Sequence, residues 1–297
     1  MFSYTSGINT PAISQLLPVV NNFNALSLFY GNRGLKPEYY HNTGLTWWLF
    51  DQFSFTTFLS NFNVRYTTDK INYSRVVDQN LKQVISFVNV KDDWDMSGNV
   101  DFSTPFRALG LMINLSLSED INRGISLINS TDNYNSTFSH RISLTLSNRK
   151  KEKWDIETGS AFTLTDTKYS VQKSMNNIYN ELSWFAGASF TPNKHFNFKV
   201  SADITGYSAR TFNESQLVPL TGAEISYYFL KNQRGVFTLA GVDLLNRNTG
   251  IERKSDLNYL LEKKSGMIGR FIMFSFKYRL NKSGDMNNGV NVKIKNR

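Results

Sequence analysis

The chain of 297 residues contains no cysteine, which excludes a disulfide scaffold and a cysteine nucleophile. Proline is scarce, with 6 residues, and glycine contributes 18, so the chain is neither collagen-like nor of low complexity. No apolar run approaches the roughly 18 residues of a transmembrane helix. The N-terminus has no basic segment followed by a long apolar one, so we expect no secretory signal in it.

Aromatic residues, in contrast, reach 14% of the chain and alternate with polar residues. From Phe274 to Leu280, bulky apolar side chains occupy every even position, and Ser275, Lys277 and Arg279 occupy the odd positions. Side chains of a β-strand point to opposite faces with a period of 2. This stretch therefore predicts a strand with one largely aromatic face and one charged face.

The same alternation recurs through most of the chain, and helical periodicity does not compete with it. The pattern predicts strands of about 10 residues or more, which suits a tilted membrane-spanning strand of roughly 9–11 residues better than a modal globular strand of about 5–6. We predict that one side-chain parity in each strand meets lipid. The predicted lipid-facing residues are Leu109, Leu111, Ile113, Leu115, Leu144, Leu146, Phe196, Phe198, Val200, Phe274 and Phe276.

The connections between predicted strands alternate between short and long. Short turns are expected near Asp51, Pro105, Lys150, Pro192 and Gln233. Long polar loops are expected at about residues 68–93, 119–136, 167–178, 208–217 and 244–267. Short turns on one side and long loops on the other are typical of an outer-membrane barrel, whose long loops face outward.

These patterns predict an all-β fold, an antiparallel transmembrane β-barrel of about 11–12 strands. The alternative is a soluble β-sandwich binding module, in which the apolar faces form a core and the polar faces meet water. Strand length, the asymmetry of the connections and the surplus of aromatics favour the barrel.

The formal net charge of +9 raises the question of nucleic-acid binding. The cations are dispersed along the predicted strands, with small clusters such as Asn148–Lys153. No basic helical face accompanies them. Solvated charges in turns therefore explain the excess of Lys and Arg better than a nucleic-acid site does, and we predict no nucleic-acid partner.

Several segments resemble the C-terminal part of TonB-dependent receptors, a family of large outer-membrane β-barrels. The stretch Gly31–Asn42, "GNRGLKPEYYHN", is similar to a GNPxLKPE motif of that family, and Pro11–Val20 resembles the segment that precedes the motif. Asp243–Leu260 and the strand after it resemble the last outer loop and the closing strand of the family.

The resemblance implies a receptor and transporter that takes up a scarce nutrient, such as an iron chelate, an oligosaccharide or a peptide. It implies about the last half of a 22-stranded barrel. Residues 1–38 would be a truncated strand and an outer loop, residues 39–280 barrel strands, and residues 281–297 a polar periplasmic tail. The implied location is the outer membrane of a Gram-negative bacterium.

The partners that the resemblance implies are outer-membrane lipid, an N-terminal plug and barrel half, TonB acting through that plug, and a surface lipoprotein. The plug and the first strands are missing from this sequence as we interpret it. A different class of function stays open, in which a non-transporting barrel anchors surface partners through its loops.

The sequence predicts no enzyme, no cofactor and no metal, and it does not identify catalytic or ligand-binding residues. His41, His140 and His195 are far apart in sequence and form no metal-binding motif. Asp92, Asp93 and Asp95 cluster in "KDDWD", Lys91–Asp95, which we interpret as a solvated outer loop because a calcium site needs about six or more oxygen ligands.

Two further groups of residues have alternative interpretations. Asp155, Glu157 and Asp203 suit a catalytic carboxylate pair, but we expect them to balance Arg141, Lys199, Lys277 and Arg279 across neighbouring strands. Trp154, Trp184, Tyr227 and Tyr278 suit sugar stacking, but aromatics at strand ends are more often girdle residues at the lipid interface.

Overall fold

A computed structural model describes residues 1–18, 21–24, 27–77, 83–171, 173–208, 214–256, 259–266 and 268–280. Most of these residues lie in β-strands; the helical elements among them are α1 (Ile13–Leu16) and the 3-10 turns η1 (Lys173–Met175) and η2 (Lys231–Gln233). In this part of the chain, no helix has the length and apolar character needed to cross a membrane. The predicted polar tail, residues 281–297, lies outside the described residues.

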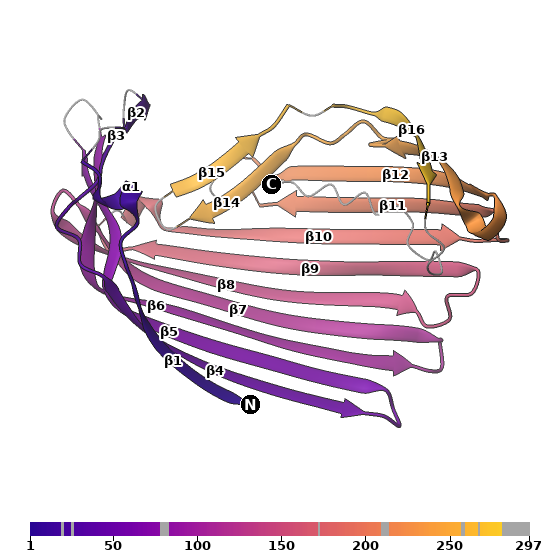
Figure 1. The fold of residues 1–297 in the computed structure, drawn as a ribbon, viewed down its shortest axis with the longest axis horizontal. Helices are drawn as coiled ribbons and strands as arrows, with labels where there is room; N and C mark the ends of the chain where they lie inside the picture. The colour runs from indigo at the N-terminus through magenta and orange to yellow at the C-terminus, as the bar shows by residue number, and fades with distance from the viewer. Residues whose placement is uncertain are drawn as a thin grey trace.

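One continuous sheet runs through twelve strands, each antiparallel to the next (Figure 1). In order across the sheet, these strands are β1 (Phe2–Asn9), β4 (Glu38–Asp51), β5 (Thr56–Val77), β6 (Gln83–Phe106), β7 (Leu111–Ile128), β8 (Thr131–Asn148), β9 (Trp154–Tyr169), β10 (Asn177–Phe190), β11 (Phe196–Tyr207), β12 (Gln216–Phe229), β13 (Gly235–Val242) and β16 (Phe271–Tyr278). The predicted all-β architecture and the predicted number of strands are confirmed.

Four short strands lie outside this path. β2 (Asn21–Asn24) pairs with β3 (Ser27–Tyr30), and β3 joins the sheet through β6. β14 (Ile251–Asp256) and β15 (Tyr259–Lys264) form a separate hairpin between β13 and β16.

Strands β1 and β16 are the two edges of the sheet. Among the described strands, β1 pairs only with β4, and β16 pairs only with β13. The sheet curves, and its two edges lie on opposite sides of the curved surface (Figure 1). Each edge strand therefore has one row of backbone N–H and C=O groups that no described strand pairs.

The two faces of the sheet differ in character because the register aligns residues of like character on neighbouring strands. Leu115 lies directly opposite Leu144 of β8 on one side and Phe102 of β6 on the other. Apolar side chains of this face are exposed, with Val200 at 56% and Phe274 at 66%. A continuous exposed apolar face is favourable only in surroundings of low polarity, such as lipid. This face therefore corresponds to the lipid-facing band of a barrel.

The opposite face is polar and less accessible. Thr67 and Thr167 on this face are each 1% exposed, as expected for side chains on the concave side of a curved sheet. In the part of the chain that the structure describes, few apolar side chains are buried and many large ones are exposed, which argues against the soluble sandwich. The concave face therefore corresponds to the lumen wall.

The predicted lipid-facing residues lie on the apolar face of their strands, with one exception. Leu109 is 67% exposed but lies in the turn before β7, which begins at Leu111. The alternation from Phe274 onward is confirmed, since Phe274 and Phe276 lie opposite Leu239 and Phe237 of β13.

The five short turns lie where predicted, at one end of the sheet, but two of the predicted long loops are wrong. Residues 68–93 and 119–136 mostly continue the strands β5, β6, β7 and β8. Only residues 78–82, outside the described residues, separate β5 from β6, and Asn129–Ser130 alone join β7 to β8. Asn129 and Ser130 have φ of 48° and 61°, the left-handed values of a two-residue hairpin turn.

"KDDWD" is likewise part of strand β6 and not a loop. Beyond the lipid band, both faces of a hairpin meet polar surroundings, so the apolar alternation that marks a strand is lost although backbone pairing continues. The remaining predicted loops at residues 167–178, 208–217 and 244–267 do contain connections, with residues 172, 209–213, 257–258 and 267 outside the described residues.

Replacing Leu115 with Arg is expected to cost about 2–4 kcal/mol of unfolding free energy, because Leu115 is the fifth residue of β7 and lies near the middle of the lipid band. Replacing Ser116 with Arg is the matched control on the polar face, where Ser116 Oγ donates to Asp101 Oδ1 at 2.6 Å. Urea unfolding in lipid vesicles measures both. Equal losses at the two positions would contradict a one-sided lipid face.

The absence of cysteine allows a direct test of the orientation of the sheet. Ser130→Cys places a thiol at the long-hairpin end, and Lys194→Cys places one at the short-turn end. In whole cells, a membrane-impermeant maleimide is expected to label the first variant and not the second. Labelling of Lys194→Cys alone would invert the orientation.

Candidate functional site

The ends of the long hairpins, which we call the outer ends because we expect them to face outward, fold over one another instead of projecting separately. Ser74 and Arg75 of β5 pair in parallel with Leu127 and Ile128 of β7, although β6 lies between these strands in the sheet. β3 pairs in parallel with the outer end of β6, from Gln83 to Ser86. These contacts gather segments far apart in sequence at one end of the sheet, where α1, β2 and β3 also lie (Figure 1).

Asparagine amides hold this outer end together through hydrogen bonds to backbone groups. Asn72 Nδ2 donates to the carbonyl of Ile125 at 2.8 Å, which fixes the tip of the β7–β8 hairpin to β5. Asn89 Nδ2 donates to the carbonyls of Lys36 and Asp69, at 2.9 and 2.7 Å. Since these hydrogen bonds join backbone carbonyls of different segments, the outer hairpins form a defined surface.

Asn32 and Asn129 extend the same kind of contact. Asn32 Nδ2 donates to the carbonyl of Phe87 at 2.9 Å. Asn129 donates its backbone N–H to the carbonyl of Arg75 at 2.8 Å and accepts from the N–H of Val77 on Oδ1 at 2.9 Å. The turn residue Asn129 thereby closes the β5–β7 contact.

Rows of polar side chains cross the lumen wall from strand to strand. One row passes from Asp95 of β6 through Asn122 and Thr137 to Thr167 of β9. Asn122 Nδ2 donates to Asp95 Oδ1 at 2.5 Å, and the hydroxyls of Thr137 and Thr167 are 3.3 Å apart. This row thus offers amide and hydroxyl groups for hydrogen bonds, with Asp95 as its one acidic residue.

Buried acidic residues lie beside this row. Asp93 is 3% exposed and Glu38 is 7% exposed. Lys70 Nζ lies 3.5 Å from Glu38 Oε1, and the amide of Asn9 also donates to Glu38. Gly124 is needed opposite Asp93, because a Cβ there would lie 2.5 Å from Asp93 Oδ2.

Asp93 lies outside the membrane-spanning part of β6. It precedes the end of that strand by 13 residues, whereas a spanning strand needs about 9–11. Burial, together with the neighbouring carboxylate of Asp95, raises the pKa of Asp93 from 3.8 to about 7. Asp93 therefore changes charge near neutral pH.

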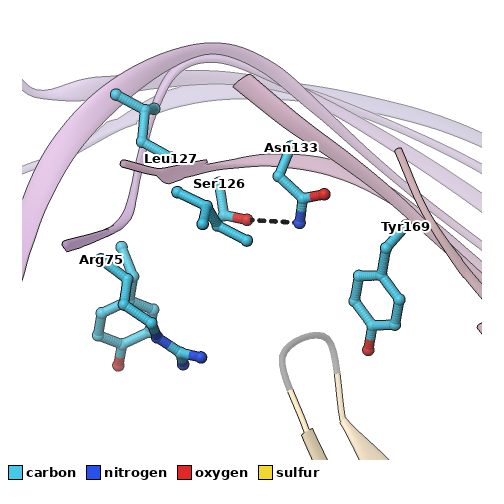
Figure 2. A pocket seen from close by; sticks show the side chains of 7 residues that line it. Arg75, Ser126, Leu127, Asn133 and Tyr169 are labelled. Carbon is cyan, nitrogen blue, oxygen red and sulfur yellow. Dashed lines mark hydrogen bonds between the residues drawn. The ribbon is translucent and has the colours of Figure 1, made fainter. Parts of the chain in front are cut away.

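A small pocket opens where β5, β7, β8 and β9 meet (Figure 2). Its lining residues are Tyr73, Arg75, Ser126, Leu127, Ile128, Asn133 and Tyr169. Asn133 Nδ2 donates to Ser126 Oγ at 3.3 Å at the back of the pocket. The pocket combines one cation, two phenols, two aliphatic side chains, one amide and one hydroxyl.

A second group of charges lies deeper on the lumen wall. Arg141 donates to Thr163 Oγ1 at 3.1 Å, and Glu181 is the next residue in that row, on β10. The carboxylate of Glu252, on β14, lies close enough to interact unfavourably with that of Glu181. This proximity places the base of the β14–β15 hairpin against the lumen face.

The histidines are separated in the fold as they are in the sequence. His140 Nδ1 contacts Glu119 Oε2 directly across the β7–β8 pair. The side chain of His41 hydrogen-bonds Tyr4 Oη at 2.5 Å, and His195 lies in the turn before β11. Among the described residues, no group of three potential ligands has the geometry to hold a metal ion.

The predicted carboxylates also stay apart. Asp155 pairs with Lys151 of its own turn at 2.7 Å, so the expected cross-strand pairing is wrong for this residue. Asp203 interacts with Lys199 on the same strand, β11. Glu157 lies opposite Gly187, and no ion pair joins it to another residue in the part of the chain that the structure describes.

The aromatics that we expect to be girdle residues, with sugar stacking as the alternative, lie on the apolar face. Trp154 stacks on Phe190, with ring centroids 4.3 Å apart, and Tyr227 packs on Phe196 at 5.1 Å. Trp184 and Tyr278 lie on the same face, opposite Ser160 and Gly235. This position suits girdle residues and does not suit contact with a solute in the lumen.

Comparison with known proteins agrees with this architecture. A family model described as "Outer membrane protein beta-barrel family" matches residues 1–278, which is the sheet from β1 to the last residue of β16. No curated protein matches the chain.

Because the folded state raises the pKa of Asp93 to about 7, its contribution to stability is present below the unfolded value of 3.8 and is lost as pH rises through about 7. Unfolding free energy is therefore expected to fall between about pH 4 and pH 8, by at most about 4 kcal/mol. Asp93→Asn is expected to flatten this dependence, as measured by urea unfolding at several pH values. The control Asp92→Asn, one residue away, leaves the slope unchanged; an unchanged slope in Asp93→Asn would contradict the assignment.

Proposed function

We propose a role in solute uptake for this chain, which belongs to the outer membrane protein beta-barrel family. Membership of this family implies the outer membrane of a Gram-negative bacterium in general terms. On that premise, the apolar face of the sheet meets lipid, and the concave polar face lines the route of a polar solute.

The observation that carries the proposal is the composition of the lumen wall. Rows such as Asp95–Asn122–Thr137–Thr167 present amides and hydroxyls along the concave face. These groups exchange hydrogen bonds with a hydrated solute, so passage does not require complete loss of its solvation.

We further propose that the solute is a scarce nutrient and that uptake depends on TonB. The support is the resemblance of Gly31–Asn42 and Asp243–Leu260 to segments of TonB-dependent receptors. An iron chelate, an oligosaccharide and a peptide are the solute classes that follow from that resemblance. TonB would act through a plug contributed by a polypeptide segment other than the residues described.

The edges of the sheet support a requirement for further strands. β1 and β16 each have one side that no described strand pairs, and an unpaired backbone group in hydrocarbon costs several kcal/mol. The apolar face continues to both edges, with Phe2 and Tyr4 on β1 and Phe274 and Phe276 on β16. Additional strands pairing with both edges would complete a barrel of about 22 strands.

A second function is favoured by the ordered outer hairpins. β5, β6, β7 and β8 continue beyond the lipid band, and Asn72 and Asn89 fix them to one another. Such a rigid outer surface suits a protein partner, and a surface lipoprotein is the partner we propose. Anchoring and uptake are compatible if the partner covers the mouth of the barrel.

Expression of residues 1–297 alone, behind an added signal peptide, is expected to give no TonB-dependent uptake, because the two sheet edges then have no partner strands. Coexpression with the upstream strands and plug is expected to restore uptake. Heat-modifiable migration and uptake of labelled solute, with and without TonB, measure the two outcomes. A monomer of the chain alone that inserts and takes up solute through TonB would contradict the proposal, and one that only leaks small solutes would indicate an independent barrel.

A further inference from the structure

We infer that the short-turn end of the sheet binds the headgroup of an anionic phospholipid, with Arg107 and Arg149 as the residues that contact its phosphate. The site lies at the β4–β5, β6–β7 and β8–β9 turns, which follow one another along one end of the sheet (Figure 1). The inference goes beyond solute uptake. It needs the apolar face of the sheet to lie in lipid, and it does not depend on TonB or on a solute.

The short turns concentrate positive charge. The turns 52–55, 107–110, 149–153, 191–195 and 230–234 contain one acidic residue, Glu152, and the cations Arg107, Arg149, Lys150, Lys151, Lys153, Lys194, Lys231 and Arg234. At the opposite end of β7 and β8, residues 119–136 contain three acidic residues and one cation, Arg123. Clustered Lys and Arg side chains at a membrane surface attract anionic headgroups. The distribution of charge therefore favours anionic lipid at the short-turn end.

Arg107 and Arg149 belong to different turns, and both reach the β4–β5 turn. Arg107 Nη2 donates to the carbonyl of Phe53 at 2.6 Å, and the guanidinium carbon of Arg149 lies 5.8 Å from the centre of the Phe55 ring. The backbone N–H of Arg149 donates to the carbonyl of Gly110 at 2.8 Å, which joins the β6–β7 and β8–β9 turns. A carbonyl group and an aromatic ring orient a guanidinium group without neutralising it. Each guanidinium group has five N–H donors, so both can still donate to phosphate oxygens.

Two acidic residues lie at the ends of the strands that flank these turns. The Asp51 carboxylate accepts hydrogen bonds from the backbone N–H of Phe53 at 3.0 Å and from Ser54 Oγ at 2.5 Å, and attraction to Arg107 is the weakest influence on it. The Asp155 carboxylate pairs with Lys151 Nζ at 2.7 Å. These two acids therefore offset little of the charge on Arg107 and Arg149.

Exposed apolar side chains beside the two arginines favour a lipid over a soluble anion. Phe53 is 82% exposed and Leu109 is 67% exposed, and Phe55 and Phe106 are also exposed. Such side chains are unfavourable in water, whereas the acyl chains of a phospholipid cover them. A soluble phosphate would leave them without contact. A phospholipid supplies the phosphate and the apolar partner in one molecule.

The test uses the chain coexpressed with the strands that complete its sheet, as a folded barrel with heat-modifiable migration. Native mass spectrometry compares dioleoylphosphatidylglycerol with dioleoylphosphatidylcholine, which has the same acyl chains and no net charge. The native protein is expected to bind the anionic lipid at least about tenfold more tightly. Arg107→Gln combined with Arg149→Gln is expected to reduce this preference to less than about twofold. The matched control, Arg33→Gln combined with Arg123→Gln, removes two exposed guanidinium groups from the opposite end of the sheet and leaves the preference unchanged.

Equal binding of the two lipids, or a full preference in the variant that lacks Arg107 and Arg149, would overturn the inference. Equal loss in the control variant would show an effect of net charge and would overturn the site. Glycerol phosphate that displaces the anionic lipid would overturn the assignment of a lipid, and lipid A that binds as tightly through the same arginines would overturn the assignment of a phospholipid. If the double variant lacks heat-modifiable migration, Arg149→Gln alone keeps the contact of Arg107 and is expected to weaken binding by at least about threefold. Unchanged binding in that variant would overturn the role of Arg149.

Discussion

Every backbone N–H and C=O group inside a bilayer has to find its partner within the protein, because hydrocarbon offers none. Strands β4 to β13 of the sheet meet this demand, since each of them is paired on both sides. The same demand explains why long strands with an exposed apolar face are stable here. An exposed side chain such as Val200 is favourable in lipid, whereas an exposed backbone group at an edge is not. The energetic cost of the unpaired backbone groups at the two edges, β1 and β16, therefore comes from the bilayer and not from side-chain composition.

The membrane-spanning part of the fold was predictable from the sequence because lipid imposes a strict pattern on it. The alternation at Phe274 and Phe276 and the row of leucines around Leu115 identified the apolar face correctly. The outer hairpins were not predictable in the same way. Residues 119–136 carry no apolar stripe, yet they pair as β7 and β8 up to a two-residue turn. Backbone pairing there depends on neighbouring strands and on Asn129 and Ser130 accepting positive φ.

Most of the candidate site could not be predicted from the sequence. Arg75 and Ile128 lie far apart in the chain and meet only because β5 pairs in parallel with β7 across β6. Nothing in the local pattern near Arg75 indicates that pairing. The burial of Asp93 was missed for a related reason, since "KDDWD" has the composition of a solvated loop. Gly124 in the neighbouring strand was the available signal, because a residue without a Cβ leaves room for a side chain opposite it.

The hydrogen bonds made by Asn32, Asn72 and Asn89 have a further consequence for a surface that we expect to meet the external medium. These contacts are between neutral amides and carbonyls, so dissolved ions do not screen them as they screen contacts between opposite charges. Surface loops cross-linked by ion pairs would loosen in brine and tighten in fresh water. The amide contacts of this end are therefore expected to hold over that range, whereas the ion pair between Lys70 and Glu38 is a contact there that depends on ionic strength.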